Sequence, residues 1–194
     1  MSIINFFRRI RQVLFRPRLP EMVSGFKSAD GNFYSDTRIS NNTYIGNPEK
    51  LFIGPNVFIG HFNFLDASNK INIGEGCQLT NYVSVITHSS HISIRLLNKN
   101  YQKFSDPPGY IKGEVTIGDY CFVGPHSVIM PGTIIGRGCI VSAYSYVQGE
   151  FPAFSIIGGQ PAKVIGSIND LDKSWLEKYP ELKDDYEKWY KRQG

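Results

Sequence analysis

The sequence predicts an all-β protein, a parallel β-helix whose short strands wind around a three-sided column. The first observation is a six-residue period of aliphatic residues that runs unbroken through Ile117, Val123, Ile129, Ile135, Val141 and Val147. The second is the same period in the first half, in groups separated by steps of eight: Ile39 and Ile45, then Ile53, Ile59 and Leu65, then Ile73, Leu79 and Val85. A period of six matches neither an amphipathic helix nor an alternating strand.

Each six-residue unit has room for one short strand and one corner. Three units close one coil of about eighteen residues, and successive coils stack through parallel strand pairing. The aliphatic residue of each unit then points inward and packs on its equivalents in the coils above and below. Glycine and asparagine suit the corners, because they adopt unusual backbone angles at little cost. The period is lost between Val85 and Ile117, where residues 89–113 form a long insertion.

The three cysteines follow the same register. Cys77, Cys121 and Cys139 each lie four residues after a repeat aliphatic, and the last two are eighteen residues apart. We therefore expect them to stack in the core as small buried hydrophobes rather than to act as catalytic thiols. An odd number of cysteines without a CxxC pair argues against a disulfide framework or a zinc ribbon and favours a reducing compartment.

Composition narrows the class of protein. A chain of 194 residues suits one domain, and its net charge of +4 gives no reason to expect a nucleic-acid partner. No apolar run is long enough to span a bilayer, and arginines interrupt residues 1–19 too often for a signal peptide. We therefore expect a cytoplasmic protein. The four histidines show no HxxxH or HxH spacing, so no metal is expected.

The chain divides into three predicted parts. Residues 1–36 form an N-terminal helix and cap, residues 37–168 the β-helix, and residues 169–194 one or two helices interrupted at Pro180. The amphipathic N-terminal stretch around Phe6 and Ile10 fits a helix packed on the column, or a basic helix resting peripherally on an anionic membrane. We favour the cap, because the open ends of a repeat stack expose strand edges that helices can cover.

The repeats, together with the segment IIGGQPAKVIG at residues 156–166, resemble the hexapeptide-repeat acyltransferases. The resemblance runs from about Thr37 to Ile168 and points to the maltose, galactoside and polysaccharide O-acetyltransferases. It implies a left-handed β-helix, a homotrimer with active sites between subunits, and transfer of an acetyl group from acetyl-CoA to a hydroxyl of a sugar or polysaccharide precursor. Two alternatives stay open: N-acetylation of an amino sugar or nucleotide-linked amino sugar, and a non-catalytic β-helix scaffold.

The stretch VSVITHSSH carries the candidate general base. Histidine suits this role because its free pKa lies close to working pH. In the resembled enzymes the base falls fifteen to seventeen positions after the residue equivalent to Ile73, and His88 and His91 lie fifteen and eighteen positions on. We predict His88 as the base and His91 as a supporting or substrate-side residue. His126, in a repeat corner, is expected to be an ordinary surface histidine.

The segment HFNFLD resembles a stretch in which family members hold the acceptor and the oxyanion. The family's asparagine aligns with His61 rather than with Asn63, so either residue is a candidate, and a corner residue without a role is as plausible. Asp66 contacts the acceptor or is an ordinary solvated acid. The insertion 89–113 is expected to select the acceptor, with Tyr101 in contact with it.

Acetyl-CoA, if the resemblance holds, lies along the C-terminal coils between two subunits. The residues that match the family's cofactor-binding positions are Phe122, Gly124, Ser142, Ala143, Pro161 and Lys163. Lys163 and Arg137 are candidates for the CoA phosphates, since both carry a mobile positive charge. In the insertion, Arg95, Lys99 and Lys103 would suit an acceptor that carries a phosphate or carboxylate.

Overall fold

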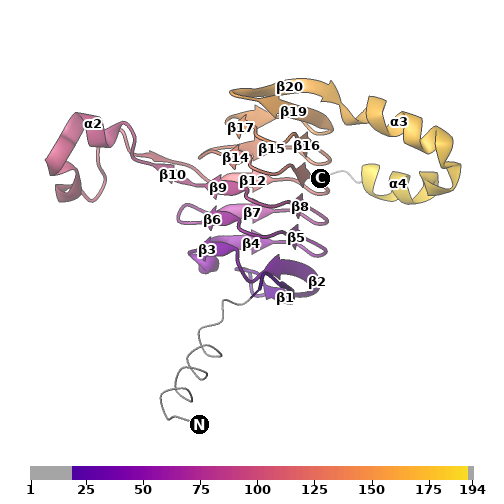
Figure 1. The fold of residues 1–194 in the computed structure, drawn as a ribbon, viewed down its shortest axis with the longest axis horizontal. Helices are drawn as coiled ribbons and strands as arrows, with labels where there is room; N and C mark the ends of the chain where they lie inside the picture. Colours follow the sequence, from indigo (N-terminus) through magenta and orange to yellow (C-terminus); the bar gives the residue numbers. More distant parts are fainter. Residues whose placement is uncertain (1–18, 192–194) are drawn as a thin grey trace, which may run out of the picture.

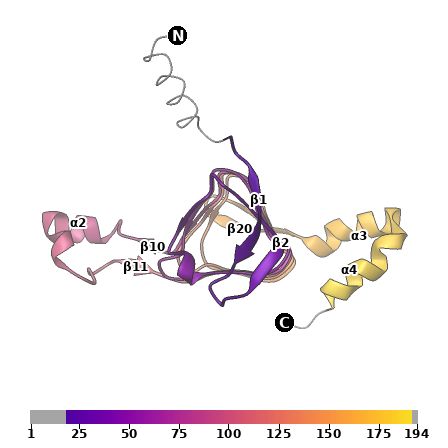
Figure 2. The same cartoon turned by 90° about the horizontal axis from the view of Figure 1, so that it is seen from below.

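The computed structural model describes residues 19–191, which form a three-sided column of stacked coils (Figure 1). Seen along its axis, the column is triangular, with two extensions that project on opposite sides (Figure 2). Each side of the triangle is one sheet, and the three sheets are called faces A, B and C. Between the coils every strand pair is parallel, as the six-residue period predicts.

Face A has eight strands in the order β1 (Met22–Lys27), β2 (Phe33–Ser40), β5 (Phe58–Ile59), β8 (Gln78–Leu79), β13 (Phe122–Val123), β16 (Ile140–Val141), β19 (Ser155–Gly159) and β20 (Ala162–Ser167). Face B has five, β3 (Tyr44–Gly46), β6 (Phe64–Asp66), β9 (Ser84–Ile86), β14 (Val128–Ile129) and β17 (Tyr146–Val147). Face C also has five, β4 (Leu51–Ile53), β7 (Ile71–Ile73), β12 (Val115–Ile117), β15 (Ile134–Ile135) and β18 (Glu150–Phe151).

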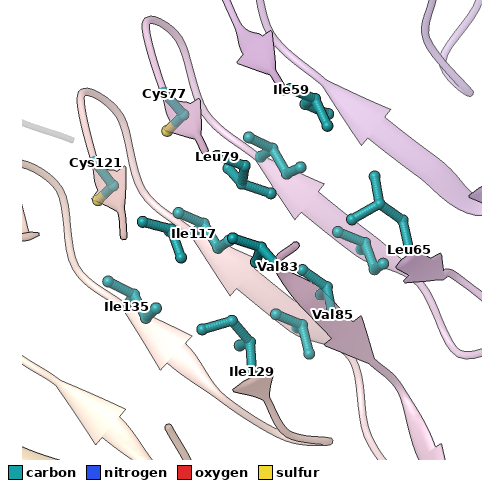
Figure 3. Packing of buried hydrophobic residues seen from close by; sticks show 14 of the residues in the cluster. Ile59, Leu65, Cys77, Leu79, Val83, Val85, Ile117, Cys121, Ile129 and Ile135 are labelled. Atoms are coloured by element: carbon teal, nitrogen blue, oxygen red, sulfur yellow. The ribbon is translucent and has the colours of Figure 1, made fainter. Parts of the chain in front are cut away.

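The predicted repeat aliphatics fill the interior (Figure 3). Thirteen of these fourteen repeat aliphatics are at most 8% exposed, and the remaining one, Ile45, is partly buried and packs against the core. The pairing register stacks them by coil, so that Leu79 pairs with Ile59 on one side and Val123 on the other. Cys77, Cys121 and Cys139 lie in the same core at 0–1% exposed, which confirms the expectation of small buried hydrophobes.

The turn from face A to face B, the A–B corner, carries a stack of flat side chains. Phe62, Tyr82, His126 and Tyr144 occupy the same corner position in successive coils, each with φ close to 60°. Such a backbone costs a non-glycine residue about 1–2 kcal/mol. Their rings stack at centroid distances of 5.2, 4.8 and 4.8 Å, an attractive spacing that offsets part of this cost.

The insertion leaves the column at the turn from face B to face C, the B–C corner. It departs along β10 (His88–Ser89) and returns along β11 (Ile111–Lys112), which pair antiparallel with His88 opposite Lys112. Between them lie α2 (Ser93–Leu97) and the 3₁₀ helix η2 (Asn98–Lys103), well away from the column (Figure 2). The two steps of eight in the repeat fall at this same corner, one of them containing the 3₁₀ helix η1 (Pro48–Lys50).

Strands rather than helices cover the two ends of face A. The strand β1 pairs antiparallel with β2 at one end, and β20 pairs antiparallel with β19 at the other. At the ends of face A, antiparallel strands rather than the expected helices therefore satisfy the open backbone groups of the described chain. The predicted N-terminal helix falls on residues 1–18, outside the described residues, and the predicted boundary after residue 36 lies within β2.

The C-terminal segment lies beside the column (Figure 1). It comprises α3 (Ile168–Lys178), the 3₁₀ helix η3 (Pro180–Leu182) and α4 (Lys183–Tyr190). Trp189 contacts Tyr120 and Phe154 at the corner between faces C and A, over the gap that Gly138 leaves. The Arg137 guanidinium donates hydrogen bonds to the last carbonyl oxygens of α4. Within residues 19–191, no helix is long and apolar enough to cross a membrane.

Candidate active site at the B–C corner

An aspartate–histidine pair lies where the insertion leaves the column. Asp66 is the last residue of β6, and His88 opens β10 one coil further on. Asp66 Oδ2 lies 2.6 Å from His88 Nδ1, and Ser68 Oγ lies 2.9 Å from the same nitrogen. Because a carboxylate only accepts hydrogen bonds, Nδ1 carries the hydrogen, and a neutral imidazole then has its lone pair on Nε2.

A buried threonine holds the two chain segments together behind this pair. Thr87 is 0% exposed, and its hydroxyl donates to the Asp66 carbonyl oxygen at 2.8 Å. The same hydroxyl accepts from the Asn69 backbone N–H at 2.9 Å, while the Asn69 amide donates to the Thr87 carbonyl oxygen. Ser68 N–H donates to Asp66 Oδ1 at 3.1 Å. These bonds fix the positions of Asp66 and His88 relative to each other.

His88 borders a cavity of about 350 Å³ under the insertion. The cavity is lined by Ser68, Asn69, His88, Tyr101, Gln102, Phe104, Ser105, Pro107, Tyr110 and Lys112. The His88 side chain is 38% exposed, and within residues 19–191 no protein group hydrogen-bonds to its Nε2. An unengaged basic nitrogen beside a cavity with hydroxyl, amide and aromatic walls can remove a proton from a bound hydroxyl group.

Aromatic rings and one charge pair form the insertion's side of the cavity. The Tyr110 ring stacks on the His88 imidazole with centroids 5.5 Å apart and an angle of 17° between the planes. Tyr101 lies 6.5 Å from Tyr110, centroid to centroid. Lys112 is paired with Asp106 at 2.5 Å. Burial is the main cause that raises the pKa of Tyr110, followed by the charges of Tyr101 and Asp66.

Of the six residues predicted for catalysis and acceptor binding, the structure brings together His88, Asp66 and Tyr101. It does not bring the predicted phosphate-binding cations of the insertion to the cavity. Arg95 Nη1 instead donates to the His91 carbonyl oxygen at 2.6 Å, and neither Lys99 nor Lys103 lines the cavity. Asp66 is held against the base rather than presented as an isolated solvated acid.

The other three predicted residues lie elsewhere. His91 is exposed on the insertion, where its Nδ1 bonds the Ser89 hydroxyl, and it does not line the cavity. His61 lies at the A–B corner, with its Nδ1 2.7 Å from Ser40 Oγ. Asn63 is 2% exposed: its amide nitrogen donates to the carbonyl oxygens of Gly60 and Thr80, and its oxygen accepts from the Val83 N–H.

This geometry leaves Asn63 without a free donor. One of its amide hydrogens is used within its own coil, on Gly60, and the other on Thr80 of the next coil, so it has none for an oxyanion. Sequence reasoning also missed Ser68, Thr87 and Tyr110, which complete the site. One feature of the sequence could have indicated Ser68. The repeat lengthens from six to eight residues between Leu65 and Ile73, and Ser68 lies in this longer turn, beside His88.

Comparison with known proteins agrees with the architecture. Residues 114–149 match the family described as bacterial transferase hexapeptide (six repeats). The galactoside O-acetyltransferase of Escherichia coli K12 is 30% identical over 148 residues, which cover 72% of this chain and 68% of the relative. The chain belongs to the hexapeptide-repeat acyltransferase family.

Two further relatives support the assignment. A putative lipopolysaccharide biosynthesis O-acetyl transferase, WbbJ of Escherichia coli K12, is 29% identical over 135 residues, 64% of this chain and 64% of its own length. A solved galactoside acetyltransferase in complex with coenzyme A is 28% identical with a TM-score of 0.58, covering 68% of this chain and 62% of that one. This hexapeptide-repeat acyltransferase therefore spans just under two thirds of both of these relatives.

The residues predicted to hold acetyl-CoA in this hexapeptide-repeat acyltransferase lie on face A and at the A–B corner, in the last coils. They belong to the neighbouring strands β13, β16, β19 and β20 or to the turns that follow them: Phe122, Gly124, Ser142, Ala143, Pro161 and Lys163. All of them but Gly124 are at least partly exposed. The strands of face B separate them from His88, by roughly 20 Å for six extended residues.

Two of the candidates for acetyl-CoA binding, Gly124 and Arg137, also serve the fold itself. A Cβ on Gly124 would lie 2.6 Å from the Ala143 backbone nitrogen, so the stacking of coils already requires glycine there. The Arg137 guanidinium is engaged with α4 and lies over the Phe154 ring. Lys163 is the better phosphate candidate, because it is exposed and pairs with no carboxylate within residues 19–191.

Proposed function

We propose that this protein is an O-acetyltransferase that moves the acetyl group of acetyl-CoA to a hydroxyl of a saccharide, with His88 as the general base. The observation that carries the proposal is the Asp66–His88 pair, whose Nε2 is unengaged beside a cavity in the described chain. Relatives named as O-acetyltransferases support the same chemistry. A scaffold would need neither the pair nor the cavity.

In the proposed reaction, His88 moves the proton and Asp66 stabilises the charge that results. When bound, acetyl-CoA supplies an activated thioester carbonyl. His88 Nε2 accepts the acceptor's hydroxyl proton as the hydroxyl oxygen attacks that carbonyl carbon, and the Asp66 carboxylate stabilises the imidazolium through Nδ1. His88 then returns the proton to the departing sulfur. One C–O bond forms, one C–S bond breaks, and the products are an acetyl ester and free CoA thiol.

The acceptor cavity suits an uncharged sugar hydroxyl. Tyr101, Phe104 and Tyr110 offer flat apolar surfaces, while Ser68, Asn69 and Gln102 offer hydrogen-bonding groups. The cavity's lysine, Lys112, is already paired with Asp106. The cations of the insertion led us to expect an acceptor that bears a phosphate or carboxylate. The groups that line this cavity do not support that expectation.

The working unit of the proposal is a homotrimer of left-handed columns, as in the resembled family. In one column the base and the predicted acetyl-CoA residues lie at opposite edges of face B, roughly 20 Å apart. A neighbouring protomer that places its A–B corner beside this B–C corner joins the two halves of the site. The insertion, which projects from that corner, would then contact the neighbour (Figure 2).

Thiol release from acetyl-CoA with a panel of neutral, phosphorylated and amino sugars tests the proposal. His88→Ala should lose at least about 100-fold in kcat while keeping the fold and the mass of three chains. Asp36→Asn is the control, since Asp36 is exposed on β2, at the end of face A away from the residues predicted to hold acetyl-CoA. Retained activity in His88→Ala with loss in His91→Ala would reassign the base. Turnover confined to amino sugars would establish N-acetylation, and no release with any acceptor would favour a scaffold.

A further inference from the structure

The aromatic contact on the candidate base is the starting observation. The Tyr110 ring lies nearly parallel to the His88 imidazole, at 5.5 Å between centroids and 17° between planes. Tyr110 comes from the returning end of the insertion, twenty-two residues after His88. The pairing of β10 with β11 sets Lys112 opposite His88, and this brings Tyr110 back over the start of β10.

The hydrogen bonds on His88 leave one motion of its ring unrestrained. Asp66 and Ser68 both contact the same atom, Nδ1. A ring held at a single atom can still swing about that point, because the χ2 torsion of histidine has a broad energy well. Nε2 lies on the far side of the ring, so a small swing moves it most. A displacement of about 1 Å of a reacting group can cost about 100-fold in rate.

Tyr110 restricts this motion from the side of the insertion. Its ring covers one face of the imidazole, Tyr101 lies 6.5 Å from it, and the Lys112 ammonium lies 5.4 Å from its centroid. The contact is between ring faces, so it needs the aromatic ring and not the hydroxyl group. The raised pKa of Tyr110 keeps it a neutral phenol at working pH.

We infer that Tyr110 is a positioning residue for His88: by stacking on the imidazole it fixes the ring plane and aims Nε2 into the acceptor cavity. The base is therefore aligned only when the insertion has returned to the column, which couples the order of residues 89–113 to catalysis. This inference rests on the proposed function of His88. The groups that face the imidazole are Asp66, Ser68 and Tyr110, with Lys112 next to Tyr110.

Two variants and one matched control test the inference. Tyr110→Ala removes the ring, and Tyr110→Phe keeps it without the hydroxyl. Tyr179→Ala is the control, because Tyr179 also stacks on a ring, Trp175, at 6.0 Å and 9°, but on the C-terminal helical segment, away from both corners of the proposed site. Steady-state kinetics gives kcat and KM for each substrate, and ¹³C NMR relaxation of labelled histidine gives the mobility of the His88 ring, assigned by comparison with His88→Ala.

We expect Tyr110→Ala to lower kcat about 10- to 50-fold, with KM for acetyl-CoA unchanged and a more mobile His88 ring. Tyr110→Phe should stay within about threefold of the parent, and Tyr179→Ala should not change kcat. A rise in acceptor KM at unchanged kcat would overturn the inference, since Tyr110 would then only be a wall of the cavity. An unchanged mobility of the His88 ring in Tyr110→Ala would overturn it as well.

The mobility measurement requires no acceptor, so it separates this inference from the proposed function. If the parent protein releases no thiol with any sugar but Tyr110→Ala still makes the His88 ring more mobile, the positioning holds and the enzymatic proposal fails. If thiol release is normal and Tyr110→Ala behaves like the parent in both measurements, the enzymatic proposal stands and the positioning role fails.

Discussion

Replacement of Asp66 by asparagine tests the reasoning about the base most directly. The change removes one negative charge and keeps the shape of the side chain, whose exposed fraction is 11%. It acts on the contact of 2.6 Å between Oδ2 and His88 Nδ1. An asparagine amide can also donate to Nδ1, which would place the histidine's hydrogen on Nε2 and remove the lone pair that the mechanism needs.

The magnitude follows from the environment of the pair. Two unit charges about 4 Å apart attract by about 1 kcal/mol in water and about 4 kcal/mol near a protein surface. The aspartate is nearly covered, but His88 is 38% exposed, so the interaction lies between these limits. A loss of about 2–3 kcal/mol of transition-state stabilisation corresponds to a fall in kcat of roughly 30- to 150-fold. Ser68 remains as a second partner of Nδ1 and keeps the loss from being complete.

Thiol release measures kcat, and thermal unfolding checks the fold. Asp36→Asn is the control, because Asp36 is an exposed acid on β2, away from the cavity. In a background with His88→Ala, the Asp66→Asn change should cost nothing further, since the two residues act as one unit. A fall of less than threefold in Asp66→Asn, with His88→Ala inactive, would refute the role assigned to the carboxylate.

Two further predictions concern the C-terminal helices. Gly132→Ala should cost about 1–2 kcal/mol of stability, because φ is 78° and the site is open. Gly138→Ala, with φ of 65°, should cost more in urea unfolding, because its Cβ would lie 2.7 Å from the Phe154 ring. It should also change tryptophan emission, because Trp189 lies 3.2 Å from the same position; unchanged emission would contradict the docking described for α4. Burial raises the pKa of the Asp172 carboxyl in the folded protein. The protonated carboxyl therefore contributes its full stability below the ordinary aspartate pKa, and this contribution is lost as pH rises through the raised pKa of the folded state. Asp172→Asn should therefore stabilise α3 and α4 at pH 7 and leave their stability unchanged near pH 3, as followed by tryptophan emission during unfolding. A lower stability at pH 7 would contradict the direction of this pKa shift.

The repeat could be predicted from the sequence because each coil depends on neighbours only about eighteen residues away. The period alone predicts the inward position of Leu79 and Val123, and the stacked register follows from that period. Cys121 and Cys139 were placed in the core for the same reason. His88, at the break in the period, was predicted as the base only through the resemblance to the hexapeptide-repeat acyltransferases, and this role stays a prediction.

The surroundings of His88 could not be predicted in this way. Asp66 and Ser68 become its partners only after one full coil brings β6 beside β9. Tyr110 reaches it only through the return path of the insertion, and no period governs a segment outside the column. His91, three residues away in sequence, is carried off by the same insertion.

By itself the sequence determined the three-sided column, its core and the corner at which His88 lies, because short-range periodicity encodes repeated burial. The tertiary structure alone decided which groups hold His88, because those contacts join segments that the chain's local pattern leaves independent. It also engaged Asn63 within the column and left no donor for an oxyanion, since Gly60 of its own coil and Thr80 of the next coil use both hydrogens of its amide.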